Sequence, residues 1–184
     1  MRLLIFGPPG AGKGTQAQFI SRRYSIPHIS TGDIFRENIR NDTPLGQEAK
    51  RYSEAGELVP DAVTNAMVKE RLSQPDTENG FLLDGYPRTQ DQARALERVL
   101  PDGTSLDAVL NMIVPEHEIL ERLSKRGRSD DADDTILKRL RIYHETTEPI
   151  AEYYRDRGIL HDIKGVGSIE DITQRIIRAI EQTA

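Results

Sequence analysis

A glycine-rich loop directly after a short apolar run constrains this chain more than any other feature. Residues 3–6 read Leu-Leu-Ile-Phe, and residues 7–15 read Gly-Pro-Pro-Gly-Ala-Gly-Lys-Gly-Thr. Glycines let the backbone turn so that successive N–H groups point inward, and the helix expected next adds the positive end of its dipole. Together with the charge of Lys13, this arrangement predicts a cradle for a polyphosphate.

The loop matches most of the phosphate-binding pattern G-x-x-x-x-G-K-[ST]. Gly7, Gly12 and Lys13 occupy the places that the pattern requires, but Gly14 follows the lysine and Thr15 comes one position later than the expected hydroxyl. The alternative is a glycine-rich turn that carries a surface lysine. We favour the phosphate loop because the flanking segments read as a strand and a helix, which is the context that the pattern needs.

Short apolar runs alternate with helical patterns along the chain. The runs predict strands at 3–6, 27–29, 81–84, 108–113 and 160–163. The helical patterns predict helices at 12–23, 32–41, 44–55, 61–73, 89–100, 116–125, 133–157 and 169–182. This alternation predicts an α/β domain with a five-stranded parallel sheet covered by helices on both faces. Because Pro149 removes a backbone hydrogen bond, we expect a kink about one turn before it.

Two segments depart from the alternation. Three helical patterns follow one another between the second and third strands, which indicates a helical insertion at 30–59. Residues 125–134 read Lys-Arg-Gly-Arg-Ser-Asp-Asp-Ala-Asp-Asp and are expected to form a small flap that pivots at Gly127. The core of the single domain would then comprise residues 1–29, 60–124 and 135–184.

Composition limits the class of protein. The chain has 184 residues, a formal net charge of −5 and no cysteine, which excludes disulfides and thiolate zinc sites. No apolar run approaches the roughly 20 residues that span a bilayer, and the first run ends in the glycine loop rather than in a signal-peptide pattern. We therefore expect a cytoplasmic protein. The acidic balance argues against a nucleic-acid binder, so arginines must be concentrated locally to bind phosphate.

The predicted strand at 81–84 ends in a carboxylate. In nucleotide-binding sheets the carboxyl ends of parallel strands face the ligand, so Asp84 would hold Mg²⁺ directly or through water. Arg88 follows four residues later, where its guanidinium would form paired hydrogen bonds with phosphate oxygens. The alternatives are an ordinary Asp-Gly turn and a solvent-facing arginine.

Two helix starts each allow two interpretations. Thr-Gln-Asp-Gln at 89–92 matches a capping box. Gln92 would then either bind back to the start of the helix or face a ligand. Ser-Thr-Gly-Asp at 30–33 also resembles a helix start. It follows the second strand, however, where Asp33 would face a ligand with Arg36 on a nearby helical face.

Arginines are dense near the polar loop. They are Arg122, Arg126, Arg128, Arg139 and Arg141. Arg126 and Arg128 flank a glycine, which suits a moving clamp. Arg122 also lies four residues after Glu118, so a stabilising pair on the helix surface is the alternative there. The four histidines form no metal-binding or catalytic pattern, and we expect them to be structural.

These motifs resemble adenylate kinase. The matching runs are residues 7–15, 30–33, 56–60 (Gly-Glu-Leu-Val-Pro), 81–89 and 128–131. They follow the family's order and spacing over essentially the whole chain. The displaced hydroxyl at Gly14-Thr15 is the form that this family uses, and the Asp-Gly-Tyr-Pro-Arg run is typical of nucleoside monophosphate kinases.

The resemblance implies a P-loop NTPase fold with a helical NMP-binding insertion and a very short lid. It implies reversible transfer of a phosphoryl group from Mg-ATP to AMP, giving two ADP, with Mg²⁺ and no zinc. ATP would be bound by Gly10, Ala11, Gly12, Lys13, Gly14, Thr15, Arg126 and Gly167. AMP would be bound by Thr31, Arg36, Glu57, Leu58, Val59, Gly85, Tyr86, Pro87, Arg88, Gln92, Arg128 and Arg139. The catalytic charges would be Lys13, Arg88, Arg122, Arg128 and Arg139, with Asp33 and Asp84 ordering the waters around Mg²⁺.

Two alternatives remain at this point. The first is a UMP/CMP kinase on the same fold, although relatives that prefer pyrimidine monophosphates tend to carry Ala in place of Thr31. The second is a nucleotide-binding switch that hydrolyses ATP slowly. The switch is disfavoured because it would not need a second phosphate clamp at Arg36 and Arg88.

Overall fold

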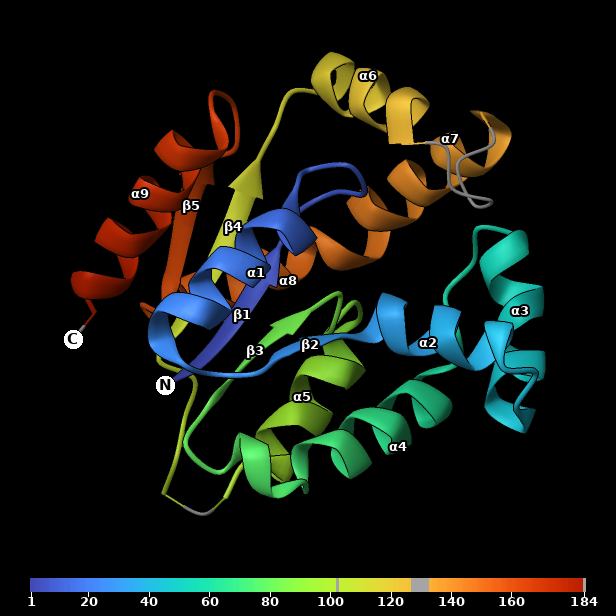
Figure 1. Ribbon diagram of the computed structural model, residues 1–184, viewed down its shortest axis with the longest axis horizontal. Coiled ribbons are helices and arrows are strands. Elements are labelled where there is room, and N and C mark those ends of the chain that lie inside the picture. Colours follow the sequence, from blue (N-terminus) through green and yellow to red (C-terminus); the bar gives the residue numbers. More distant parts are fainter. Residues whose placement is uncertain (102, 127–132, 184) are drawn as a thin grey trace.

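The computed structural model describes residues 1–101, 103–126 and 133–183, and within them five strands form one parallel sheet (Figure 1). The strand order is β2-β3-β1-β4-β5. The strands are β1 (Arg2–Phe6), β2 (His28–Ser30), β3 (Phe81–Asp84), β4 (Ala108–Ile113) and β5 (Leu160–Lys164). The sequence prediction of the sheet is therefore confirmed, and each strand end lies within one residue of its predicted place.

The central strand β1 is buried on both faces. Its Leu4 pairs with Leu83 of β3 and Val109 of β4, and these three residues belong to one core cluster. The neighbouring Leu3 and Ile5 belong to the other cluster, because successive side chains of a strand point to opposite faces. Burial on both faces explains why the strands read as continuous apolar runs.

Helices cover the two faces of the sheet (Figure 1). One face packs against α1 (Lys13–Tyr24) and α9 (Ile169–Glu181), with α6 (Glu116–Arg126) and α7 (Asp133–Ile142) contributing to the same core. The other face packs against α4 (Asp61–Leu72), α5 (Gln90–Val99) and α8 (Pro149–Arg155). A short 3₁₀ helix, η1 (Pro75–Thr77), precedes β3.

Helices α2 (Thr31–Arg40) and α3 (Pro44–Glu54) lie to one side of the sheet (Figure 1). Thr43 joins them, because its hydroxyl donates to Asn38 Oδ1 at 2.7 Å and accepts from the Gly46 N–H at 3.1 Å. The second bond caps the N-terminus of α3. This helical pair occupies the place that the sequence predicted for an insertion.

The predicted helix over 133–157 is divided by a π-helical turn, η2 (Tyr143–Thr147), between α7 and α8. The Glu148 N–H donates to the carbonyl of Tyr143, five residues back, at 2.8 Å. Pro149 has no N–H and cannot continue the regular helical ladder. The disturbance therefore lies in the turn before Pro149, as expected.

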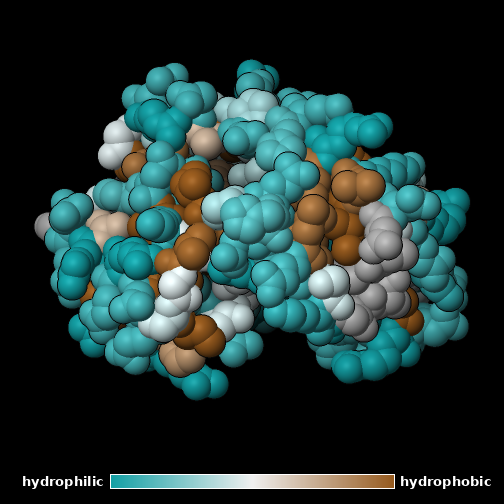
Figure 2. Space-filling view, turned by 90° about the horizontal axis from the view of Figure 1, so that it is seen from above, coloured by the Kyte–Doolittle hydropathy of each residue, from teal (hydrophilic) through white to brown (hydrophobic). Residues whose placement is uncertain are grey.

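Hydrophilic residues cover most of the face seen from above, and hydrophobic residues gather in small separate patches (Figure 2). None of the helices in the described ranges is long and apolar enough to cross a membrane. Most of the predicted flap at 125–134, including Gly127 and Arg128, lies outside the described residues.

Candidate active site

The glycine loop connects β1 to α1 and lies against α6. Gly10 has φ +84°, and a Cβ atom there would lie 2.8 Å from Leu123 Cγ, so a side chain would disrupt this contact. Gly12 forms the N-cap of α1 with φ +89°. The first N–H groups of a helix have no partner within the helix, so this end of α1 can bind an anion.

Lys13 is held at the inner side of the loop. Its Nζ donates to the carbonyl of Gly7 at 2.8 Å and to that of Pro8 at 2.9 Å. Asp84, at the end of β3, faces the same loop, because a Cβ atom placed on Gly14 would lie 3.7 Å from Asp84 Oδ2. The predicted lysine and carboxylate therefore lie at one edge of the sheet.

Lys13 belongs to a cluster of positive charges. Desolvation by burial and, after it, the charges of Arg88, Arg139 and Arg126 together lower the pKa of Lys13 to about 8, although the Asp84 carboxylate opposes this shift. Four cations around one carboxylate give this region a strong positive potential. Such a potential suits the binding of a polyanion.

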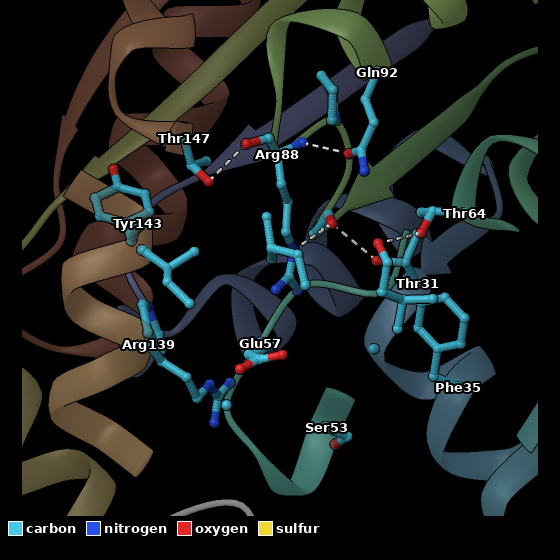
Figure 3. A pocket seen from close by; sticks show the side chains of 18 of the residues that line it. Thr31, Phe35, Ser53, Glu57, Thr64, Arg88, Gln92, Arg139, Tyr143 and Thr147 are labelled. Atoms are coloured by element: carbon cyan, nitrogen blue, oxygen red, sulfur yellow. Dashed lines mark hydrogen bonds between the residues drawn. The ribbon is translucent and has the colours of Figure 1, made fainter. Parts of the chain in front are cut away.

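A pocket opens beside Lys13 and extends toward α2 and α3 (Figure 3). Lys13 itself lines it, and so do Phe35 and Ser53, to which the sequence gave no role. Of the residues predicted to bind AMP, those that line the pocket are Thr31, Arg36, Glu57, Leu58, Val59, Gly85, Pro87, Arg88, Gln92 and Arg139. These residues come from four separate parts of the chain, and Lys13, predicted to bind ATP, adds a fifth part to the same pocket.

The carbonyl of Gly85 organises the charged side of this pocket. It accepts from the Thr31 hydroxyl at 2.9 Å and from Arg88 Nε at 2.8 Å (Figure 3). Gly85 has φ +80°, and a Cβ atom there would lie 2.9 Å from Thr31 Oγ1. Glycine at this position allows Thr31 and Arg88 to approach the same carbonyl.

Several predicted site residues lie away from the pocket wall. Tyr86 is buried in the core, where its hydroxyl donates to Asn65 Oδ1 at 2.6 Å. Arg122 lies behind the glycine loop and donates to the carbonyl of Ala11 at 3.4 Å and to that of Gly165 at 3.0 Å. Arg122 therefore connects the loop to the segment that carries Gly167, which has φ +120°.

Both charged side chains predicted on α2 contact each other. Arg36 Nη2 donates to Asp33 Oδ1 at 2.5 Å, and the Asp33 side chain is 65% exposed. The Asp33 N–H also donates to Ser30 Oγ, so the capping interpretation of residues 30–33 is confirmed. Arg36 lines the pocket, which leaves its proposed ligand contact compatible with this geometry.

The donor set near the loop fits Mg²⁺. Mg²⁺ keeps several waters and is bound through one or two carboxylates together with substrate phosphates. Asp84, buried beside the loop, can supply such a carboxylate. In the described part of the chain, no group of three or more His, Cys, Asp or Glu side chains could hold a metal ion by itself. A buried carboxylate beside the phosphate loop therefore matches the small protein contribution that Mg²⁺ needs when substrate phosphates supply its other ligands.

Sequence reasoning missed three contacts at the site. His28 Nε2 lies 3.3 Å from Asp84 Oδ2, although the histidines were expected to have no role beyond structure. Lys138 of α7 forms an ion pair with Glu57 at 2.7 Å. Asp61 accepts hydrogen bonds from two residues of the loop and helix that follow β3. Each joins residues far apart in sequence, and no local pattern marks it.

Comparison with known proteins agrees with this geometry. The adenylate kinase family model matches residues 5–159. An adenylate kinase from Nocardia farcinica is 53% identical over 181 residues, which cover 98% of this chain and 99% of that protein. Adenylate kinases from Kocuria rhizophila and Mycobacterium tuberculosis are 53% and 52% identical, with the same shares of each chain covered. The chain belongs to the adenylate kinase family.

Proposed function

We propose that this enzyme transfers a phosphoryl group reversibly from Mg-ATP to AMP and so produces two ADP. ATP would occupy the glycine loop at 7–15, and AMP would occupy the pocket beside it. One observation carries the proposal: Lys13 belongs to the phosphate loop and also lines the pocket that holds Thr31 and Arg88. The two anion sites therefore adjoin, as direct transfer requires.

The chemistry needs charge neutralisation more than proton transfer. The second pKa of a phosphate monoester is about 6, so the acceptor is mostly ionised at pH 7 and needs no general base. Two polyanions must instead be brought together. Lys13, Arg88 and Arg139 line the pocket, and we assign them, with Arg122 and Arg128, to this task. Mg²⁺, when bound with the nucleotide, would supply further neutralisation of the phosphate charge.

The remaining residues are assigned either to ATP in the glycine loop or to AMP in the pocket beside it. The backbone of residues 10–15, the Arg126 side chain and the Gly167 backbone would contact ATP. The other residues proposed for AMP are Thr31, Arg36, Glu57, Leu58, Val59, Gly85, Tyr86, Pro87, Gln92 and Arg128. Asp84 and Asp33 would order the waters around Mg²⁺, with Asp84 better placed because it is buried beside the loop.

Water must be excluded, because otherwise ATP would be hydrolysed. We propose that the insertion at 30–59 closes over AMP and that the short loop at 125–134 closes over ATP. The ion pair between Lys138 and Glu57 supports this view, since it links α7 to the insertion across the edge of the pocket. We also propose a monomer that serves adenine nucleotide balance in the cytoplasm.

A coupled assay of ADP formation tests the proposed function. Mg-ATP is supplied with AMP, UMP, CMP or GMP as the acceptor. We expect efficient turnover with AMP and at least ten-fold lower kcat/KM with the other three. A preference for UMP or CMP would instead support the pyrimidine kinase alternative and overturn the assignment of Thr31.

A further inference from the structure

Asp61, the first residue of α4, holds the side-chain amide of Gln92 in place. Asp61 Oδ1 accepts from Gln92 Nε2 at 2.7 Å, and Asp61 Oδ2 accepts from the Thr89 hydroxyl at 2.7 Å. On the other side of the amide, Gln92 Oε1 accepts from the Arg88 N–H at 2.7 Å (Figure 3). Both ends of the amide are therefore engaged by the protein.

These partners fix which way the amide faces. The carboxylate of Asp61 can only accept, and the backbone N–H of Arg88 can only donate. If the amide of Gln92 turned over, its oxygen would face a carboxylate and its NH₂ group would face an N–H group. Gln92 is only 2% exposed, so water could not readily replace the two lost bonds.

The fixed amide borders the pocket, and its end is directed into it (Figure 3). Each engaged atom keeps one further bonding position, because an amide oxygen has two lone pairs and an amide nitrogen has two protons. The amide can thus offer one acceptor and one donor side by side. A 6-aminopurine presents the complementary pair, an exocyclic N–H donor beside the N1 acceptor. A 6-oxopurine presents the reverse pair, an O6 acceptor beside an N1–H donor.

We infer that Asp61 is a positioning residue that makes the site selective for 6-aminopurine over 6-oxopurine monophosphates. It does so by preventing Gln92 from turning over to the arrangement that a 6-oxopurine needs. This inference rests on the proposed function, because it takes the pocket as the AMP site. It predicts a change in base selectivity, which a loss of folding alone would not produce.

The test compares kcat/KM for AMP and IMP, with the KM for ATP measured in parallel. We expect the wild-type enzyme to prefer AMP by at least ten-fold. In Asp61→Ala the AMP-to-IMP preference should fall at least ten-fold, which corresponds to about 1.4 kcal/mol, while the KM for ATP stays within two-fold. Asp61→Asn should retain more of the preference than Asp61→Ala. The side-chain oxygen introduced by Asp61→Asn can still accept from Gln92 Nε2, while the introduced NH₂ group donates to Thr89 Oγ1.

Asp76→Ala is the matched control, because it removes a carboxylate that pairs with Arg71 on an exposed surface away from the pocket. Asp76→Ala should leave both the AMP-to-IMP preference and the KM for ATP unchanged. A folded Asp61→Ala enzyme whose AMP-to-IMP preference stays within two-fold of wild type would overturn the inference. If Asp61→Ala does not fold, the wild-type enzyme decides: a preference for AMP of less than ten-fold overturns the inference. Absence of AMP turnover in the wild type would instead refute the proposed function itself.

Discussion

Replacing Arg88 by Ala should abolish most of the turnover while leaving the fold intact. The backbone of Arg88 makes two contacts that Ala would keep: its N–H donates to Gln92 Oε1, and its carbonyl accepts from the Thr147 hydroxyl at 3.1 Å. The guanidinium donates through Nε to the Gly85 carbonyl and lines the pocket. The substitution therefore removes the charged group from a backbone that the surroundings still hold.

The expected loss follows from the hydrogen bonds that a guanidinium makes with phosphate. Hydrogen bonds to charged groups contribute about 1.5–3 kcal/mol each, so a bidentate contact is worth about 3–6 kcal/mol. This range corresponds to a loss of roughly 10²- to 10⁴-fold in kcat/KM. Arg88→Lys should be intermediate, since it keeps the charge but cannot form the paired contact.

Steady-state ADP formation with saturating Mg-ATP and varied AMP measures this effect, and urea unfolding checks the fold. Arg71→Ala serves as the control, because Arg71 pairs with Asp76 and does not line the pocket. A folded Arg88→Ala enzyme with kcat/KM within three-fold of wild type would refute the reasoning.

Three further predictions concern charge, backbone geometry and the contact between α7 and the insertion. The pKa of Lys13 is about 8 in the folded protein and 10.5 ordinarily, so between these pH values the unfolded chain binds more protons than the folded one. The unfolding free energy of the wild type, relative to that of Lys13→Met, should therefore rise from pH 8 to pH 10. Urea unfolding measures this difference, and a flat or falling difference would contradict the prediction. Gly85→Ala should lower the unfolding free energy by about 1–2 kcal/mol, because Ala is strained in the left-handed backbone conformation, and should raise the KM for AMP through the contact with Thr31. Gly103→Ala, with φ +75° and no atom near its Cβ, should show only the loss of stability. Equal KM values for AMP in the two variants would count against the role of Gly85. Lys138→Ala should lower the unfolding free energy by less than about 1 kcal/mol, because the Lys138 and Glu57 side chains of this ion pair are 40% and 48% exposed. A larger loss in urea unfolding would show that the pair contributes more than an exposed ion pair does.

The local features of the fold were predictable because short-range patterns determine them. Apolar runs and glycine turns located the strands, and the N-cap half of the capping pattern at 89–92 was confirmed, since the Thr89 hydroxyl accepts from the Gln92 N–H at 3.1 Å. The side chain of Gln92 did not complete that pattern. It turns to the Arg88 N–H and to Asp61, so tertiary contacts determined its place.

The contacts between distant segments were not predictable from spacing. His28 and Asp84 lie on the neighbouring strands β2 and β3, yet 56 positions separate them in sequence. Arg122, one of the predicted catalytic charges, donates to carbonyls of the loop and of the segment near Gly167 and pairs with Glu118. Helical spacing revealed the pair with Glu118 and gave no sign of the other two contacts.

The central claim is that the enzyme passes a phosphoryl group directly between two bound nucleotides. ATP labelled at its γ-phosphate, mixed with Mg²⁺, unlabelled AMP and the enzyme, tests this claim most directly. We predict that the label appears in the β-phosphate of ADP, with release of inorganic phosphate below a few per cent of the ATP consumed. Label released mainly as inorganic phosphate, at a rate that does not depend on AMP, would contradict the claim and indicate a hydrolytic nucleotide switch.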